Sequence, residues 1–403
     1  MKIKRRLIQF VKILIRNGLI VVNEILTRLP VKRGYYLFES FNGKDVSDNP
    51  AAIYRELIRQ DPDARTRAFF GVKPSRYAAV HAKHPKIRLL RRFMPKWIYY
   101  TARAQFWVFN SRMPTWWRKN RRTFYLQTWH GTPLKKLGLD MHQVEMPGTS
   151  TQRYKRHFVK ETQRWQALIA PNLYSERVFK HAFDFHRQFL KIGYPRNDVL
   201  YRDNTSSKIR RLKQRLVGRS NVPVITYAPT WRDDDYLHRG AYRFELKFSL
   251  AKFFRHVDPR TILIIRPHYL IKSRINVGQF ADRVKVIRNV DISQIYLISD
   301  LLITDYSSVM FDYANLNRPM LFFSYDLDHY RQTLRGFYFN YCRDIPGPLA
   351  TNAQELYHDL DLYTKRHGFP DYRIKMKRFR HQFCTWESAH SSSQVVQFLG
   401  NQK

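Results

Sequence analysis

Short apolar runs alternate with longer amphipathic stretches through most of the chain, and this alternation predicts its architecture. An apolar run too short for a helix is typical of a buried strand. Five such strands are predicted before residue 200, at Tyr35–Phe38, Phe106–Phe109, Thr123–Leu126, Ala167–Ala170 and Phe189–Ile192. Five more follow, at Val222–Tyr227, Thr261–Ile265, Val284–Ile287, Leu301–Ile303 and Met320–Phe323. Strands separated by helices are typical of largely parallel sheets, so the pattern predicts two α/β domains.

The domain boundaries are predicted where this pattern changes. Residues 1–30 form a first unit, residues 31–200 an N-terminal α/β domain, residues 201–380 a C-terminal α/β domain and residues 381–403 a tail. The polar segment Asp203–Ser207 is the predicted linker between the two domains. A chain of 403 residues is long enough for each domain to bury a core of its own.

The first thirty residues predict one basic amphipathic helix. Its polar positions recur close to the helical period, at Arg5, Gln9, Lys12, Arg16, Asn23 and Thr27. The opposite side carries the apolar residues Ile3, Leu7, Phe10, Leu14, Val21 and Ile25. Because Lys12 and Arg16 interrupt the apolar run, we do not expect this helix to span a membrane. It either lies on a membrane surface or docks on its own domain.

The stretch Ser299–Pro319 predicts a strand, a turn and a helix in succession. An apolar run at Leu301–Ile303 precedes the turn, and a helical pattern follows it. Ser307 and Ser308 fall where that helix begins. The unpaired N–H groups of a helix N-terminus attract anions, phosphate above all. The alternative for the two serines is an ordinary helix cap.

A second stretch of interest is Leu126–Asp140, where His130 lies between an apolar run and a Gly-Thr-Pro turn. Lys135 and Lys136 follow closely. A histidine on a loop at a strand end, next to a flexible glycine and two cations, is well placed to move a proton near a negative group. The alternative is a histidine that serves only the structure.

The net charge of the chain restricts the kinds of partner that it is expected to bind. Lysine and arginine number 72 against 32 aspartate and glutamate, which gives a formal net charge of +40. A polyanion is therefore expected, whether nucleic acid, an anionic membrane or a phosphate polymer. Residues 64–139 contain no acidic residue but many aromatic ones, a composition that suits strand cores, a membrane interface or single-stranded nucleic acid. The only cysteines, Cys342 and Cys384, favour a reducing compartment.

Six stretches of the chain together resemble the CDP-glycerol glycerophosphotransferase family, which builds teichoic acid chains. They are SDNPAAIY from Ser47, TWHGTPLKKLG from Thr128, GYPRND from Gly193, YAPTWR from Tyr227, IIRPH from Ile264 and LLITDYSSVMFDYANLNRP from Leu301. Each is a weak signal alone. All six occur in the family's order, so the resemblance covers most of the chain.

The resemblance implies a GT-B-like fold, with two Rossmann-like domains and a cleft between them. It also implies transfer of glycerol phosphate from CDP-glycerol to a hydroxyl of a lipid-linked acceptor, a saccharide or a glycerol phosphate chain, with release of CMP. Such a reaction needs a base for the attacking hydroxyl and donors around the pyrophosphate. His130 is the predicted base, since imidazole has a suitable pKa. The resemblance adds His268 as a second catalytic residue.

The same resemblance implies a set of residues that contact the donor. They are Trp129, Gly131, Thr132, Pro133, Arg196, Pro229, Thr230, Arg266, Pro267, Ser307, Ser308 and Asp312. Arg232 is a weaker candidate. Asp48 and Asn49 follow the first strand and either face the acceptor or cap a helix before Pro50.

We predict neither a metal site nor a cofactor, since CDP-glycerol is a substrate and no His/Cys cluster has ligand spacing. Asp233, Asp234 and Asp235 form a solvated loop or bind a cation, so a divalent cation stays an open alternative.

Other functions remain open at this point. Among enzymes these are a CDP-ribitol or other polyol phosphate transferase and a GT-B glycosyltransferase. A basic nucleic-acid-binding protein would explain the charge but not the ordered motifs, and we expect no nucleic-acid partner. Because the chain begins almost directly at the catalytic half, a primase or short-chain role is favoured. We expect peripheral attachment to the cytoplasmic face of an anionic cell membrane.

Overall fold

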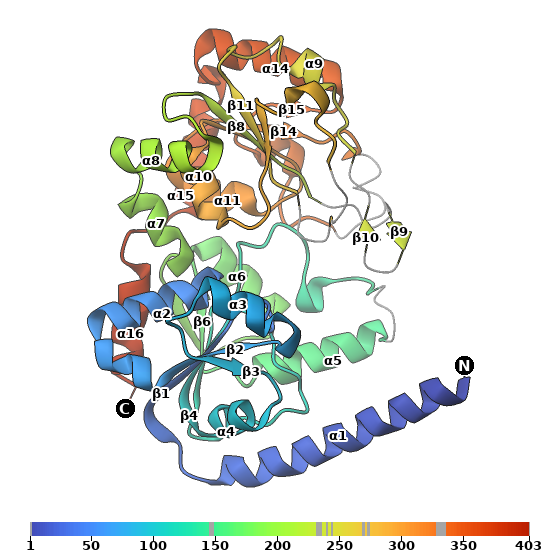
Figure 1. Cartoon of the computed structure of the whole chain (residues 1–403), viewed down its shortest axis with the longest axis vertical. Coiled ribbons are helices and arrows are strands. Elements are labelled where there is room, and N and C mark those ends of the chain that lie inside the picture. Colours follow the sequence, from blue (N-terminus) through green and yellow to red (C-terminus); the bar gives the residue numbers. More distant parts are fainter. Residues whose placement is uncertain are drawn as a thin grey trace.

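The computed structural model describes residues 2–144, 149–230, 236–238, 241–242, 245–267, 271, 275–327 and 336–402. Two lobes stand one above the other, and each is built around its own parallel sheet (Figure 1). All ten strands predicted from the sequence are present, with ends shifted by a few residues at most. The predicted mixed α/β class is therefore confirmed.

The first lobe contains seven parallel strands in the order β3-β2-β1-β4-β5-β6-β7. They are β1 (Lys32–Glu39), β2 (Ala68–Val72), β3 (Leu89–Arg91), β4 (Ala104–Phe109), β5 (Phe124–Gln127), β6 (Ala167–Ala170) and β7 (Gln188–Lys191). Its helices are α2 (Asp48–Gln60), α3 (Tyr77–Lys83), α4 (Pro95–Arg103), α5 (Thr151–Thr162) and α6 (Leu173–Ala182). The sequence analysis missed β2 and the three-residue edge strand β3.

The second lobe contains six parallel strands in the order β12-β11-β8-β13-β14-β15. They are β8 (Val224–Ala228), β11 (Ile262–Ile265), β12 (Val284–Val286), β13 (Leu301–Thr304), β14 (Met320–Phe323) and β15 (Leu349–Ala350). Its helices are α8 (Ser206–Val217), α9 (Leu250–Phe253), α10 (Ile292–Ile298), α11 (Val309–Tyr313), α13 (Tyr341–Asp344), α14 (Ala353–Arg366) and α15 (Arg373–Phe383). A hairpin of β9 (Tyr236–His238) and β10 (Ala241–Tyr242) stands apart from the sheet.

Both sheets follow the same winding rule. Each begins at its centre, adds two strands on one side and then returns to add the others on the opposite side. This is the strand order of a Rossmann fold, in which ligands bind beyond the carboxyl ends of the two central strands. The rule places the binding region next to β1 and β4 in the first lobe, and next to β8 and β13 in the second.

The C-terminal segment returns to the first lobe. The helix α7 (Asp198–Arg202) leads out of that lobe, and α16 (Ser391–Gly400) comes back and packs against α2 (Figure 1). Val395 and Leu399 are buried in the first lobe's core. The Asp198 carboxylate accepts hydrogen bonds from the N–H groups of Ser391 and Ser392 at 3.0 and 2.8 Å, which caps α16. The two lobes are thus joined by two crossing segments.

The basic, aromatic segment of residues 64–139 lies mostly in the core of the first lobe. Trp97, Trp107 and Trp117 are fully buried, so these rings are not available to a membrane or a nucleic acid. Lys119 is also partly buried, and its ammonium donates to the carbonyl of Thr123 at 2.5 Å. Burial lowers the pKa of Lys119 to about 8. The exposed cations of this run are therefore fewer than the sequence suggests.

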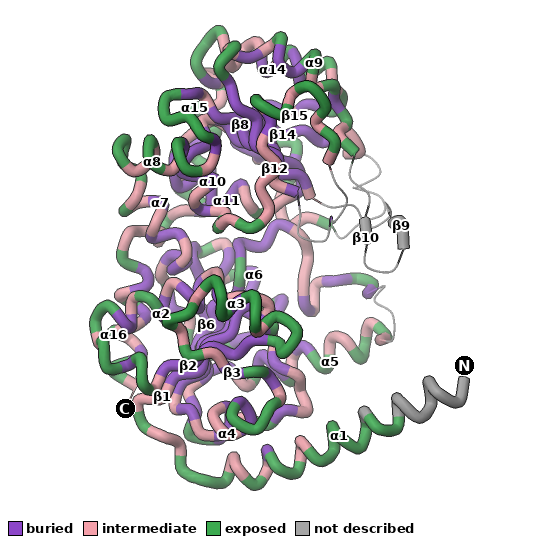
Figure 2. The backbone as a smooth tube through the Cα atoms, viewed as in Figure 1, coloured by how far each residue is buried: buried purple, intermediate pink, exposed green. Residues whose placement is uncertain are grey.

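The helix α1 (Lys2–Arg28) lies along the bottom of the first lobe and extends beyond it (Figure 1). Its C-terminal half is docked by the side that carries Leu19, Asn23 and Leu26. The two leucines pack against the core of the first lobe, and the side-chain oxygen of the buried Asn23 accepts from the N–H of Arg118 at 2.7 Å. The predicted apolar stripe points the other way. Phe10, Leu14, Val21 and Ile25 are exposed, each by 55–59% (Figure 2). Within the described part of the chain, no helix is long and apolar enough to cross a membrane.

Candidate active site

The carboxyl ends of the two sheets face a common cavity of about 1710 Å³ that is lined by both lobes. Six residues singled out from the sequence lie on its walls. They are Asp48, His130 and Arg196 from the first lobe and its exit, and Arg266, Ser308 and Asp312 from the second. Two motifs meet here, because a Cβ atom placed on Gly131 would lie 3.4 Å from the Ser308 hydroxyl oxygen. A glycine keeps this gap between the His130 loop and the serine loop open.

His130 follows β5 and is held in one tautomer. Its Nδ1 lies 2.8 Å from the carbonyl oxygen of Asn110, which directly follows β4. A carbonyl can only accept, so Nδ1 carries the proton and Nε2 is the basic nitrogen of the neutral ring. The Trp129 ring stacks on the imidazole at 4.5 Å, and Phe41 meets it edge-on at 5.7 Å. The ring is thus fixed on three sides.

The electrostatic surroundings of His130 favour its neutral form. The ring is accessible from the cavity, but the protein packed around it removes much of its hydration. This desolvation lowers the pKa of His130 below its ordinary value, against the opposing effects of the Asn110 carbonyl and the Asp48 carboxylate. A neutral imidazole with an available Nε2 can take a proton from a hydroxyl.

Backbone conformations uncommon for residues with a side chain gather around this point. Phe41, Asn42, Asp48 and Trp129 all have φ between 48° and 58°. Such left-handed conformations cost energy and persist where the surrounding contacts require them. Here those contacts involve the loop that carries Trp129 and His130, the segment of Phe41 and Asn42, and the segment that begins at Asp48.

Arg196, just after β7, bridges the two lobes. Its guanidinium donates to Asp48 of the first lobe at 2.7 Å and to both carboxylate oxygens of Asp312 in the second lobe at 3.0 and 2.9 Å. All three side chains are mostly buried, with 16% of Arg196 exposed, 5% of Asp48 and 12% of Asp312. The two carboxylates hold the pKa of Arg196 well above its ordinary value. Arg196 is therefore a fixed cation at the junction of the lobes.

Two asparagines complete the support beneath the cavity. Asn110 donates from its side chain to the second oxygen of Asp48 at 2.5 Å, so His130 and Asp48 share one neighbour. Asn49 is fully buried, donates to the carbonyl of Trp129 at 3.0 Å and accepts from the N–H of Arg196 at 3.1 Å. Asn49 thus fixes the histidine loop from below. Its position in the structure is that of a supporting residue.

Glu387 is an acidic group near the site that the sequence analysis did not single out. The Asn197 amide links it to Asp312, donating to both carboxylates at 3.0 Å. A Cβ atom on Gly193 would lie 2.7 Å from a Glu387 carboxylate oxygen, which is why a glycine opens the motif GYPRND. Burial raises the pKa of Glu387 to about 8, and the nearby Asp312 carboxylate adds to the rise. Glu387 is thus largely protonated at neutral pH.

This raised pKa predicts a pH dependence of stability. Between the ordinary glutamate pKa and about pH 8, the folded protein keeps a proton that the unfolded chain loses, so the free energy of unfolding falls as the pH rises through this range. In denaturant unfolding at pH 5.5 and 8.5, Glu387→Gln should remove this part of the slope, up to about 1.4 kcal/mol per pH unit.

The matched control is Glu355→Gln. Hydrogen bonds from Thr351 lower the pKa of Glu355, so its contribution is constant above pH 5 and the control should shift stability equally at both values. An unchanged pH slope in Glu387→Gln would show that Glu387 is ionised in the folded protein.

The second-lobe loops are braced against one another. Asp305 accepts a hydrogen bond from the N–H of Thr230 at 2.8 Å and so ties the end of β13 to the end of β8. Ser308 is the residue before α11, as the pattern predicts, and it is exposed to the cavity, whereas Ser307 is half-buried. Pro229 lies buried beside Thr230. Of these loops, the one that carries Ser308 lines the cavity.

The Arg266 side chain already donates two hydrogen bonds to the backbone. Its guanidinium bonds the carbonyls of Ile287 and Val290 at 3.0 and 2.9 Å, and burial lowers its pKa. It holds the loop before α10 and still lines the cavity. Pro267 is buried behind it. His268, Arg232 and Asp233–Asp235 lie outside the described residues, so the structure says nothing of their contacts.

The predicted donor residues Trp129, Thr132 and Pro133 lie beneath the cavity and, like Gly131, Pro229, Thr230, Pro267 and Ser307, are not part of its lining. Trp129 packs on Phe183 at 4.6 Å, and Thr132 is buried beside Asn172. The carbonyl of Pro133 accepts a hydrogen bond from Tyr174 at 2.8 Å. Of the supporting residues that the sequence analysis did not single out, Asn110 directly follows a predicted strand and Asn197 lies within the motif GYPRND, whereas Glu387 had no such signal.

Known proteins resemble this chain over most of its length. The family described as CDP-glycerol:poly(glycerophosphate) glycerophosphotransferase matches residues 21–401. The teichoic acid poly(glycerol phosphate) polymerase of Bacillus subtilis (strain 168) is 42% identical over 98% of this chain and 53% of its own length. The chain therefore spans about half of that polymerase. The teichoic acid glycerol-phosphate transferase of Staphylococcus aureus (strain NCTC 8325 / PS 47) is 41% identical over 96% of this chain and 98% of its own.

Solved structures of the wall teichoic acid polymerase TagF share the fold. One of them, a histidine variant soaked with CDPG, superposes with a TM-score of 0.86 at 35% identity and covers 98% of this chain and 97% of its own. Relatives with other names are more distant. A teichoic acid glycerol-phosphate primase of Bacillus subtilis (strain 168) is 28% identical, and a teichoic acid poly(ribitol-phosphate) polymerase of Bacillus spizizenii is 27% identical.

Proposed function

The chain belongs to the CDP-glycerol:poly(glycerophosphate) glycerophosphotransferase family, and from this premise we propose that its interlobe cavity transfers glycerol phosphate from CDP-glycerol to a hydroxyl of a lipid-linked teichoic acid acceptor. The observation that carries the proposal is the meeting of His130 and Ser308 in that cavity, with only Gly131 between their loops. A proton acceptor and a phosphate-binding loop are the two parts that the reaction needs.

The chemistry assigned to His130 follows from its tautomer. The acceptor hydroxyl gives its proton to Nε2 while its oxygen attacks the phosphorus next to glycerol. A new O–P bond forms as the bond to the bridging oxygen of the pyrophosphate breaks, and CMP leaves with the electron pair on that oxygen. Asn110 accepts from Nδ1 throughout, which stabilises the imidazolium formed during the step. His268 is proposed as the second catalytic residue on the family resemblance alone.

The second lobe is proposed to bind the donor in a GT-B-like arrangement. Two Rossmann strand orders with facing carboxyl ends, and a C-terminal helix that returns to the first lobe, support this arrangement. Ser307 and Ser308 would bind the pyrophosphate with their hydroxyls and the N–H groups of the turn. Arg266, Pro267, Pro229 and Thr230 would complete that side. Arg196 and Asp312 would shape the cavity between the lobes, because their charges already satisfy each other.

Glycerol is favoured over ribitol as the polyol of the donor. The relatives named for glycerol phosphate reach 42% identity, whereas the ribitol-phosphate polymerase reaches 27%. The same comparison favours a transferase or polymerase over the primase role expected from the sequence. The experiment is to incubate the protein with a lipid-linked acceptor and either CDP-glycerol or CDP-ribitol, and to measure CMP. Release from CDP-ribitol alone, or from neither, would overturn the proposal.

We also propose that the protein attaches to the surface of an anionic membrane. The apolar stripe of α1 points away from the lobe that holds the helix, which is the arrangement expected of a helix lying in a lipid interface. Arg121 and Arg122 are exposed on the same lobe and would attract anionic headgroups. Because the proposed acceptor is anchored in the membrane by its lipid, the cavity would also lie close to the bilayer.

Membrane attachment is tested by co-sedimentation with vesicles. Leu14→Ser with Val21→Ser should abolish sedimentation, because it removes two exposed apolar side chains from the stripe. Arg121→Ser with Arg122→Ser should weaken binding to anionic vesicles severalfold at low salt, and the difference should shrink at high salt, where the attraction is screened. Lys252→Ser with Arg255→Ser, on the second lobe, is the matched control for lost charge. Equal sedimentation of all variants would exclude this surface from the attachment.

A further inference from the structure

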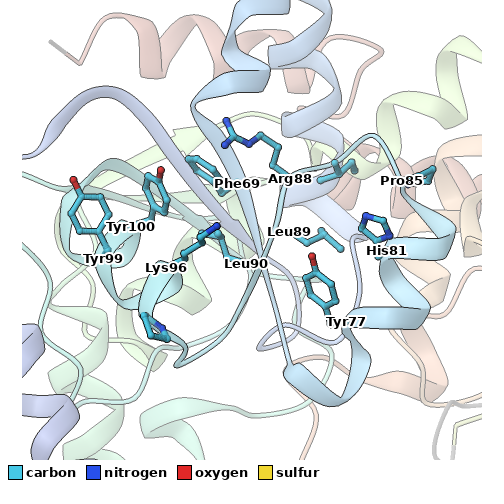
Figure 3. Close-up of a pocket in the computed structure, with 12 residues that line it drawn as sticks. Phe69, Tyr77, His81, Pro85, Arg88, Leu89, Leu90, Lys96, Tyr99 and Tyr100 are labelled. Atoms are coloured by element: carbon cyan, nitrogen blue, oxygen red, sulfur yellow. The ribbon is translucent and has the colours of Figure 1, made fainter.

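A second hollow lies at the edge of the first sheet, outside the cavity described above. It has a volume of about 620 Å³ and crosses the edge strand β3 between α3 and α4 (Figure 3). We call it the edge groove. Its lining residues are Phe69, Tyr77, His81, Pro85, Ile87, Arg88, Leu89, Leu90, Pro95, Lys96, Tyr99 and Tyr100. Its size is within the range of small-ligand sites.

The chemistry of the edge groove is aromatic and cationic. Tyr100 stacks on Phe69 with 4.1 Å between the ring centroids. The Arg88 guanidinium carbon lies 4.7 Å from the centroid of the Phe69 ring. Lys96 is exposed at the opposite wall (Figure 3). No lining residue is acidic. Flat aromatic faces suit the apolar face of a sugar ring, and unopposed cations suit a phosphate.

The position of the edge groove links it to the proposed reaction. One side of α3 lines the main cavity with Arg76 and Lys83, and another side lines the edge groove with Tyr77 and His81. On the far side of the groove, α4 packs against α1 (Figure 1). The groove therefore lies between the helix proposed to meet the membrane and the cavity that holds His130. Of the two cations, Arg76 directly precedes α3, and Lys83 is paired with the Asp45 carboxylate at 3.0 Å.

We propose that the edge groove binds the phosphate-bearing saccharide of the lipid-linked acceptor while the free end of the acceptor reaches over α3 to His130. This inference rests on the proposed function and adds an acceptor site to it. The saccharide packs against the side chains of Tyr99 and Tyr100, and Arg88 and Lys96 bind its phosphate. A bilayer-anchored acceptor has to cross this face of the lobe to reach the cavity.

The test is steady-state kinetics of CMP release with the full chain and a lipid-linked acceptor in phosphatidylcholine vesicles. Arg88→Ser with Lys96→Ser should raise the KM for the acceptor about tenfold, and Tyr99→Leu severalfold, with kcat and the KM for CDP-glycerol unchanged. Lys377→Ser with Arg378→Ser, two exposed cations on α15, is the matched control and should behave as the unaltered protein does.

A soluble arm distinguishes the two sources of phosphate. The same acceptor headgroup on a short alkyl chain, without vesicles, should show the same rise in KM, because the groove binds the saccharide phosphate itself. A rise seen only in vesicles would mean that Arg88 and Lys96 bind membrane lipid, and would overturn the inference. An unchanged acceptor KM in an active enzyme would overturn it too. No CMP release by the unaltered protein would instead refute the proposed function.

Discussion

Replacing His130 with alanine is expected to lower the turnover of glycerol phosphate transfer by about two to four orders of magnitude. In the described cavity, His130 is the only group whose basic nitrogen, Nε2, is left free by a fixed tautomer, because its Nδ1 is bonded to the Asn110 carbonyl. The alanine variant loses this nitrogen. CMP release at saturating CDP-glycerol and acceptor is the measurement. Because the surroundings lower the pKa of His130, the unaltered protein should stay active to lower pH than a solvent-exposed histidine would allow.

The matched control is His130→Asn, which keeps a polar side chain next to Asn110 but has no basic nitrogen. Its affinity for CDP-glycerol, measured by calorimetry, should stay within a few-fold of the unaltered value while its turnover falls like that of the alanine variant. His268→Ala is expected to have a similar effect on turnover, on the strength of the motif alone. Near-normal turnover of His130→Ala would remove this residue from the role of general base.

Replacing Arg196 with alanine is expected to lower the free energy of unfolding by about 3–5 kcal/mol, because it leaves the mostly buried carboxylates of Asp48 and Asp312 without their cation. Asp48 belongs to the first lobe and Asp312 to the second, so the same change should loosen the junction of the lobes. Denaturant unfolding measures the first effect. Arg196→Lys should lose less, since one ammonium can still neutralise part of the charge.

The control for Arg196 is Arg59→Ala. Arg59 also pairs with a carboxylate through two donors, at 2.8 and 2.7 Å from Glu56, but its side chain is 69% exposed. Exposed pairs contribute little, so this variant should lose far less stability than Arg196→Ala. Adding Asp48→Asn and Asp312→Asn to Arg196→Ala should restore part of the lost stability. If Arg196→Ala were no more damaging than Arg59→Ala, the bridge would not hold the lobes together.

The strands and the loops that carry the motifs could be predicted from the sequence because their signals are local. An apolar run such as Ala167–Ala170 or Met320–Phe323 specifies a buried strand whatever its neighbours are, and both have these bounds in the structure. The turns that follow β5 and β13 were predicted for the same reason, together with His130, Ser307 and Ser308. Edge strand β3 was missed because it holds only two apolar residues, Leu89 and Leu90, with arginines on both sides.

The tertiary structure alone decided which residues support the site. Asn110 bonds His130 and Asp48, and Asn197 bonds Asp312 and Glu387, across separations of 20 to 190 residues, and no local pattern encodes a contact of that kind. It also decided the direction of α1. The sequence determined a helix with an apolar stripe and a polar stripe, but either side could have faced the protein. Leu19, Asn23 and Leu26 face the protein, and Val21 and Ile25 are exposed, because the surface on which the helix lands offers both a core edge for the leucines and the N–H of Arg118 for Asn23.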